Sequence, residues 1–251
     1  MRESDPLLHA DDFAAALVLL SRWPLRVSRY AMARGARTAW CWPLVGLVLA
    51  SLATLLAISL QSIGINAEIT ALLALTLLII MTGALHEDGL ADVADGFWGG
   101  FERSRRLEIM KDSHIGSYGV LALILSLGLR GGALIALTDH LAIALLTSAV
   151  LSRAAMAYVM GSLPNARDSG LSAETGRPGR KPVQIALLIA AIVALLLVGW
   201  PVIWLLLTVA FVTWACARLA DTKIGGQTGD VLGATQQMTE IASLIALTAL
   251  L

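Results

Sequence analysis

The chain has 251 residues, of which 57% are hydrophobic and only 14% are charged, and its mean hydropathy is +0.78. A soluble domain carries about 25% charged residues, so this composition excludes an ordinary soluble fold and indicates an integral membrane protein. The 18 basic and 18 acidic side chains cancel in number, which excludes a broad basic surface for nucleic acid. No soluble segment, low-complexity tract or repeat interrupts the apolar pattern, so residues 1–251 are predicted to form one membrane domain.

The predicted fold class is all-α, a polytopic membrane bundle. The first element, residues 13–20, is too short to cross a bilayer and is expected to be an interfacial or re-entrant helix. Seven transmembrane helices are then predicted near residues 40–62, 69–85, 117–137, 141–160, 183–198, 202–219 and 231–251. The three residues 199–201 between the fifth and sixth could form a tight external turn or a kink in one long helix.

The basic residues predict the orientation of the bundle. Residues 22–37 contain five arginines, residues 103–111 four basic side chains and residues 167–181 another four. The connecting segments 61–68, 138–140 and 199–201 contain none. By the positive-inside rule the N-terminus and the charged loops face the cytoplasm, and the chain ends on the far side.

An acidic run directly follows the second predicted crossing. Glu87, Asp88, Asp92 and Asp95 lie within nine residues. In a helix the three aspartates stand at i, i+4 and i+7 and share one face. Carboxylates in such a stripe repel one another unless a cation lies between them, and Mg²⁺ prefers oxygen ligands shared with substrate phosphates. These four residues are the predicted metal ligands; the alternative is a solvated acidic helix start favoured by the helix dipole.

The next loop supplies predicted phosphate-binding groups. Arg103, Arg105, Arg106 and Lys111 could neutralise phosphate oxygens, and His114 stands among polar residues directly before an apolar helix. The alternative for each arginine is an ordinary positive-inside residue. Further along, residues 164–177 could close on a substrate or form a plain linker.

A glycine-rich segment precedes the last predicted helix. Gly226, Thr228 and Gly229 are predicted to bind substrate, since glycine lets backbone amides approach a ligand closely. Asp230 could complete the metal site or accept a proton from a substrate hydroxyl; otherwise it caps the helix.

Three ionisable residues interrupt apolar helices and are functional candidates by default. Arg153 and Glu240 are expected to lie close enough to the cytoplasmic face to support the site, whereas Arg130 is expected to be structural.

Residues 86–119 and 225–234, together with 21–24 and 42–46, resemble the cobalamin synthase family, the adenosylcobinamide-GDP ribazoletransferases. The resemblance covers nearly the whole chain. It implies an enzyme of the bacterial inner membrane, with its site facing the cytoplasm, that joins α-ribazole or its 5′-phosphate to adenosylcobinamide-GDP and releases GMP, using Mg²⁺. The family's acidic signature corresponds to the run from Glu87 to Asp95, although Glu87 departs from the pattern of many members, and its glycine-rich signature corresponds to Gly226, Thr228, Gly229 and Asp230.

The residues and the resemblance converge on one hypothesis. Asp92, Asp95 and Asp230 are the predicted catalytic carboxylates, and either Asp92 or Asp95 would take the proton of the attacking hydroxyl. Partners would be the two substrates and the lipid bilayer; the oligomeric state, including a homo-oligomer, is left open.

Two other functions remain as alternatives. The acidic spacing is distantly similar to that of the CDP-alcohol phosphotransferases of phospholipid synthesis, but residues 88–92 read Asp-Gly-Leu-Ala-Asp where those enzymes continue to Ala-Arg. A transporter would instead spread ionisable residues through the bilayer midplane, whereas here most charges fall in the loops.

Overall fold

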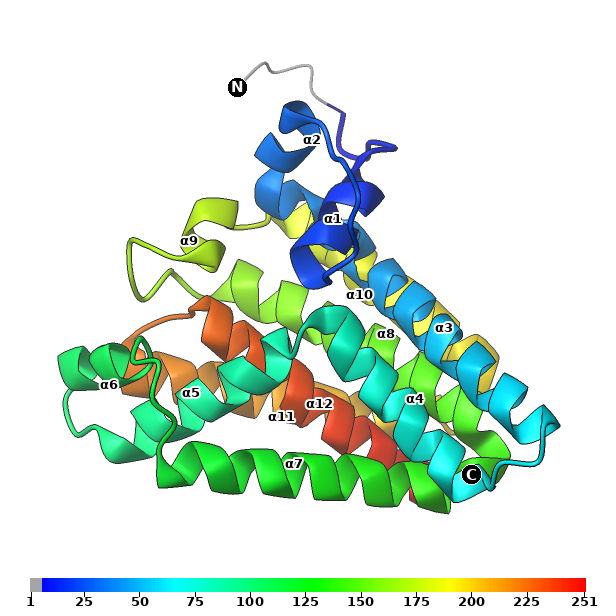
Figure 1. Cartoon of the computed structure of the whole chain (residues 1–251). Coiled ribbons are helices and arrows are strands. Elements are labelled where there is room, and N and C mark those ends of the chain that lie inside the picture. The colour runs from blue at the N-terminus through cyan, green and yellow to red at the C-terminus, as the bar shows by residue number, and fades with distance from the viewer. Residues whose placement is uncertain (1–5) are drawn as a thin grey trace.

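The computed structural model describes residues 6–251 and forms a bundle of helices (Figure 1). Its elements are α1 (Asp12–Leu20), α2 (Arg29–Ala33), η1 (Gly35–Cys41), α3 (Trp42–Ser62), α4 (Ala67–Thr82), α5 (Leu85–Gly99), α6 (Arg103–Ile109), α7 (Ser117–Ala136), η2 (Thr138–His140), α8 (Leu141–Ser162), α9 (Leu171–Thr175), α10 (Arg180–Val198), α11 (Val202–Ile224) and α12 (Gly229–Leu250). Within residues 6–251 no strand forms, and the one β-bridge pairs Asn165 with Gln227. The all-α membrane fold is therefore confirmed.

Fewer helices meet the requirements for crossing a membrane than the seven predicted. In the described chain five are long and apolar enough: η1 with α3, η2 with α8, and α7, α10 and α11. The pair α4 and α5 adds a sixth if it counts as one broken span. The last predicted crossing forms α12 but is not among them, because its buried inner turns carry polar side chains such as Gln236, Gln237 and Glu240.

Helices α8 and α12 lie at the centre of the bundle, and 83% of the apolar window of α8 is buried. Helix α3 packs on α8 and α4, helix α10 packs chiefly on α8, and α7 packs on α5 and α12. Helices α5, α6 and α9 gather at the end of the molecule opposite the C-terminus (Figure 1). The short predicted N-terminal helix forms as α1, which packs beside α3.

The chain turns sharply between α4 and α5, whose axes differ by 84°. Gly83 and Ala84 both have positive φ angles, 63° and 56°. The turn is covered by Arg22, whose backbone N–H donates to the Met81 carbonyl at 2.7 Å and whose side chain fills the space where Gly83 lacks a Cβ. The sequence predicted a crossing over 69–85 followed by an acidic helix, but it gave no sign of this bend, since alanine rarely adopts a left-handed conformation.

The open question at residues 199–201 is answered in favour of the tight turn. Helix α10 ends at Val198, Gly199 has a φ of 76°, and α11 begins at Val202.

The strain at Ala84 gives a first prediction. Ala84→Gly should raise the free energy of unfolding by about 0.5–1 kcal/mol, because the left-handed conformation costs alanine about 1–2 kcal/mol and glycine recovers most of this despite its larger backbone entropy. The measurement is thermal unfolding of the detergent-solubilised protein. The same change at Ala94, inside α5, should lower stability instead, by about 0.5–1 kcal/mol. Equal shifts in both variants would contradict the assignment of strain to Ala84.

Candidate functional site

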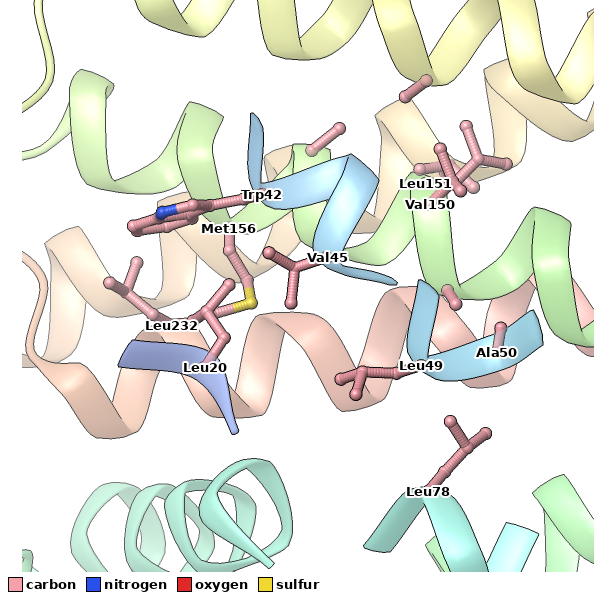
Figure 2. Close-up of a cluster of buried hydrophobic side chains, with 14 of the residues drawn as sticks. Leu20, Trp42, Val45, Leu49, Ala50, Leu78, Val150, Leu151, Met156 and Leu232 are labelled. Carbon is pink, nitrogen blue, oxygen red and sulfur yellow. The ribbon is translucent and has the colours of Figure 1, made fainter. Parts of the chain in front are cut away.

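A cavity of about 300 Å³ opens at the end of the bundle where the charged loops meet. Its floor is apolar and is formed by Leu20, Trp42, Met156 and Leu232 from four different helices, which Figure 2 shows directed toward one another. Its wall and mouth are polar and include the side chains of Asp88, Lys111, Arg167 and Asp230. The structure thus brings residues of the acidic helix and of the glycine-rich segment together at one cavity. Such a cavity can hold a ligand with an apolar body and a charged, polar end.

Two glycine contacts place the acidic helix α5 against the start of α12. A Cβ on Gly89 would lie 2.8 Å from the Asp230 carbonyl oxygen. One turn further along α12, a Cβ on Gly233 would lie 3.2 Å from the Cα of His86. Only glycine permits this close backbone approach. The contact therefore brings the carboxylates of α5 beside Asp230.

The carboxylates at this contact interact through their charges. Asp92 does not itself line the cavity. It is partly buried and lies within electrostatic reach of Asp230, Asp88 and Asp95, and of the opposite charge of Arg167. Arg167 forms an ion pair with Asp230 and so offsets part of this repulsion. The hydroxyl of Thr228 also donates to Asp230, at 3.1 Å. This excess of negative charge is suited to a cation or to the positive end of a ligand.

Asp95 has a different environment from Asp88 and Asp92. It is buried, and its two carboxylate oxygens accept hydrogen bonds from the backbone N–H groups of Gly116 and Gly119, at 2.7 and 2.9 Å. Both donors belong to the beginning of α7, so Asp95 caps that helix. To act as the predicted metal ligand or base, Asp95 would have to use the oxygen lone pairs that these two hydrogen bonds do not occupy.

Glu87 points into the bundle and does not line the cavity. Its carboxylate forms an ion pair with Arg130, at 3.0 Å, and accepts from the Gln237 amide, at 3.1 Å. Arg130 also reaches Glu240 at 3.3 Å, and Glu240 lies 3.8 Å from Arg153. These buried charges connect α5, α7, α8 and α12. Glu87 therefore has two cationic or amide partners inside the protein, and the structure does not bring it to the other predicted metal ligands.

Two of the three predicted phosphate-binding arginines hold loops together. Arg103 donates to the carbonyls of Ile224 and Ala166, at 2.7 and 2.6 Å, and Arg106 donates to the carbonyl of Lys223, at 2.9 Å. These carbonyls include the last ones of α11, where a helix end attracts positive charge. None of the three arginines lines the cavity. The third, Arg105, forms an exposed ion pair with Glu108 at 2.8 Å.

The other two predicted groups of this loop differ in position. Lys111 lines the cavity, and its amine lies 3.4 Å from the Ser169 hydroxyl of the opposite loop. His114 is exposed outside the cavity lining, and its ring lies 2.7 Å from the Asp112 carboxylate. Hydrogen bonds from the ring and from the backbone N–H of His114 hold the pKa of Asp112 below its usual value. The structure therefore supports a substrate-facing position for Lys111 but not for His114.

The glycine-rich segment pairs with the loop that follows α8. The Gln227 N–H donates to the Pro164 carbonyl and the Ala166 N–H to the Gln227 carbonyl, both at 2.8 Å. Gly226, with a φ of 159°, permits this pairing because a Cβ there would lie 2.3 Å from the Pro164 oxygen. Gly226 is thus a packing residue, whereas the predicted substrate-binding residues Thr228 and Gly229 line the cavity.

Several lining residues were not singled out from the sequence. Arg167 and Ser172 belong to the loop that had been left between substrate closure and a plain linker, and the Ser172 hydroxyl donates to the buried Gln227 side chain at 2.7 Å. His86 lines the cavity as well, with its Nε2 atom buried and without a hydrogen-bond partner. These residues lie beside motifs noted in the sequence, which is the only signal that the sequence offered for them. Their position at the cavity depends on contacts between distant segments, such as that between Arg167 and Asp230, which are 63 residues apart.

The carboxylates near the cavity form at most part of a site for Mg²⁺. Within residues 6–251, no three His, Cys, Asp or Glu side chains converge closely enough to form a complete metal site. Mg²⁺ usually keeps several waters and takes one or two carboxylates together with substrate phosphates. Asp88 and Asp230 both line the cavity, and two carboxylates are what this incomplete type of site needs.

Comparison with known proteins identifies the family of this chain. Residues 12–248 match the family model described as cobalamin-5-phosphate synthase. The chain belongs to this family. A relative from Sinorhizobium medicae, an adenosylcobinamide-GDP ribazoletransferase, is 44% identical over 94% of this chain and 95% of its own length. Relatives of the same name from Rhizobium johnstonii and Bradyrhizobium diazoefficiens are 41% and 45% identical over 95% and 84% of this chain, and over 96% and 82% of their own lengths. No solved structure matches the chain significantly.

The buried ion pair between Arg130 and Glu87 gives a second prediction. Arg130→Met should lower the free energy of unfolding by about 3–5 kcal/mol, because it leaves Glu87 buried without its cation. Thermal unfolding in detergent measures the effect. Arg105→Met removes an exposed arginine and should change stability by less than about 0.5 kcal/mol. Adding Glu87→Met to Arg130→Met should recover part of the loss; additive losses in the double variant would contradict direct pairing.

Proposed function

We propose that this chain joins α-ribazole, or its 5′-phosphate, to adenosylcobinamide-GDP and releases GMP. A ribose hydroxyl attacks the corrinoid-side phosphorus of the pyrophosphate, forming a new phosphorus–oxygen bond. The bond from this phosphorus to the oxygen that bridges it to GMP breaks, and that oxygen leaves with GMP. The relatives align with this chain over nearly the full length of both proteins, and their names support the transferase.

The observation that carries the proposal is the two-sided cavity. Asp88, Asp230, Arg167 and Lys111 surround its mouth, over a floor of Trp42 and other apolar side chains. A site for a phosphorylated nucleotide needs basic side chains to bind the phosphates and carboxylates to bind the metal ion that accompanies them. The face of a corrin ring is apolar, whereas its edge carries polar amide side chains. A ligand with a phosphorylated nucleotide and an apolar face can bind the charged mouth and the apolar floor of the same cavity.

The side chains divide the work by charge. Lys111 and Arg167 would bind phosphate oxygens and stabilise the negative charge that develops as GMP leaves. Asp92 would accept the proton of the attacking hydroxyl, because it is partly buried beside Asp88 and Asp230, whereas the oxygens of Asp95 are held by backbone amides. Apolar side chains below the mouth would exclude water and so protect the pyrophosphate from hydrolysis.

Asp88, Asp92 and Asp230 are the residues that would hold Mg²⁺, with the pyrophosphate as the further ligand. When bound, the ion would supply positive charge to the transferring and leaving oxygens.

The proposed location is the bacterial inner membrane, with the cavity open to the cytoplasm. The segments that line the cavity are those that carry the clusters of basic residues, such as Lys111 and Arg167. The positive-inside rule places such segments on the cytoplasmic side, where a GDP-activated substrate is available.

The third prediction tests the reaction directly. Purified protein given adenosylcobinamide-GDP, α-ribazole and Mg²⁺ should release GMP together with a corrinoid product, and EDTA should stop both. Asp92→Asn should lower kcat by about 100-fold or more, since it removes the base and a metal ligand while keeping the side-chain shape.

Asp221→Asn is the matched control, because Asp221 is an exposed aspartate in the last turn of α11 whose charge does not act on Asp92 or Asp230. Its kcat should stay within about twofold of the wild type. Equal activity of the Asp92 variant and the wild type would refute the role of Asp92. Release of CMP from a CDP-lipid, without release of GMP, would refute the proposed substrates.

A further inference from the structure

A second hollow, of about 500 Å³, lies between the end of α8 and the start of α10, outside the cavity described above. Its polar rim contains the side chains of Arg177, Arg180, Ser162 and Gln184. Both arginines are exposed, and neither is used in the proposed reaction. No carboxylate lines this hollow, so its charge is positive.

An apolar groove of about 390 Å³ continues from this hollow along α8, α10 and α11. Tyr158 and Leu187 line both, which makes the two spaces adjacent. The floor and walls of the groove carry small side chains, including Ala154, Ala190 and Ala210. Helix α10 packs chiefly on α8 rather than on α11, although only three residues separate α10 from α11 in the chain. The groove is the space left where these two helices diverge.

The groove has the length of one membrane leaflet. From Arg180 to Ala191, the positions on α10 that bound the two spaces, the helix rises roughly 16 Å. Half of a bilayer's hydrocarbon core is about 15 Å thick. Since the arginines lie on the same side of the bundle as the charged loops, the groove runs from the headgroup level toward the bilayer midplane.

We propose that this combined space binds one anionic phospholipid. Its phosphate lies between Arg177 and Arg180, and an acyl chain lies in the groove between α10 and α11. Arg177 donates one hydrogen bond to the Gly161 carbonyl, at 2.9 Å, and a guanidinium has five N–H donors, so others serve the phosphate. Tyr158 is half-exposed and lines both spaces, and tyrosine is a residue that commonly lies at the membrane–water interface.

Charge and shape favour a lipid over a second copy of this chain. A partner helix would have to present acidic side chains at the rim and a bulky apolar ridge below it. An anionic lipid supplies both features in one molecule, and basic pockets between transmembrane helices on the cytoplasmic side are typical sites for such headgroups. The bound lipid would also brace the loop between Gly161 and Arg177, which contains Arg167 of the main cavity.

The fourth prediction is tested by native mass spectrometry of the delipidated, detergent-solubilised protein, titrated with phosphatidylglycerol or phosphatidylcholine in the absence of substrate. The wild type should retain one phosphatidylglycerol more tightly than phosphatidylcholine. The double variant Arg177→Gln/Arg180→Gln should weaken phosphatidylglycerol about 30-fold, from about 1 kcal/mol for each lost arginine, and leave phosphatidylcholine unchanged.

Two further variants separate this site from general membrane attraction. Arg26→Gln/Arg29→Gln removes the same charge from exposed positions before α2 and in its first turn, and its lipid binding should equal that of the wild type. Ala210→Phe fills the groove at an exposed position and should weaken phosphatidylglycerol without any change of charge.

Three results would overturn the proposal: equal retention of the two lipids by the wild type, equal loss in both arginine double variants, or a dimer that forms through α10 and α11 and retains no lipid. Because binding is measured without substrate, its failure is distinct from failure of the proposed transferase. Unchanged thermal unfolding of each variant confirms that it is folded.

Discussion

The buried ion pair between Arg130 and Glu87 decides how the acidic helix sits in the bundle. A carboxylate inside a membrane protein is costly unless a cation compensates it. Arg130 from α7 supplies that charge, and Glu240 of α12, reached by both Arg130 and Arg153, extends the network. With Glu87 turned inward, its neighbour Asp88 is rotated by about 100° and lines the cavity. The same run of sequence thus provides an anchor and a functional face.

Close helix packing also determines where the acidic helix lies. The bend at Gly83 and Ala84 redirects the chain by 84°, so that α5 lies along α12 instead of continuing α4. Gly89 then allows the backbone of α5 to touch that of Asp230. Asp88 and Asp230, from two distant parts of the chain, meet at one cavity, and Arg167 from a third part pairs with Asp230. The bend, the glycine contact and the buried ion pair together position these side chains.

The loop between α8 and α10 links the two binding regions of the molecule. One side of it forms hydrogen bonds with the glycine-rich segment and contributes Arg167 to the main cavity. Its end, at Arg177, returns to the Gly161 carbonyl beside the second hollow. The loop therefore connects the main cavity, whose apolar floor is seen around Trp42 in Figure 2, with the second hollow.

Much of this protein was determined by the sequence alone. Composition established a helical membrane protein, the basic residues predicted its sidedness, and the spacing of Asp88 and Asp92 marked the acidic helix. The sequence also offered Asp230 as a completion of the site on this helix, and Asp88 and Asp230 line one cavity in the structure. These features depend on hydropathy and helical periodicity, which are local properties that a single sequence displays.

Only the tertiary structure decided what each charged side chain contacts. Arg103 and Arg106 were expected to bind phosphate but hold the end of α11, Glu87 turns inward, and Asp95 caps α7. Arg167 gained a role that its loop did not reveal. In each case the deciding partner is a backbone carbonyl, an amide or an opposite charge more than twenty residues away. The local sequence shows that a charged residue is present, but the packing of the helices determines which group it contacts.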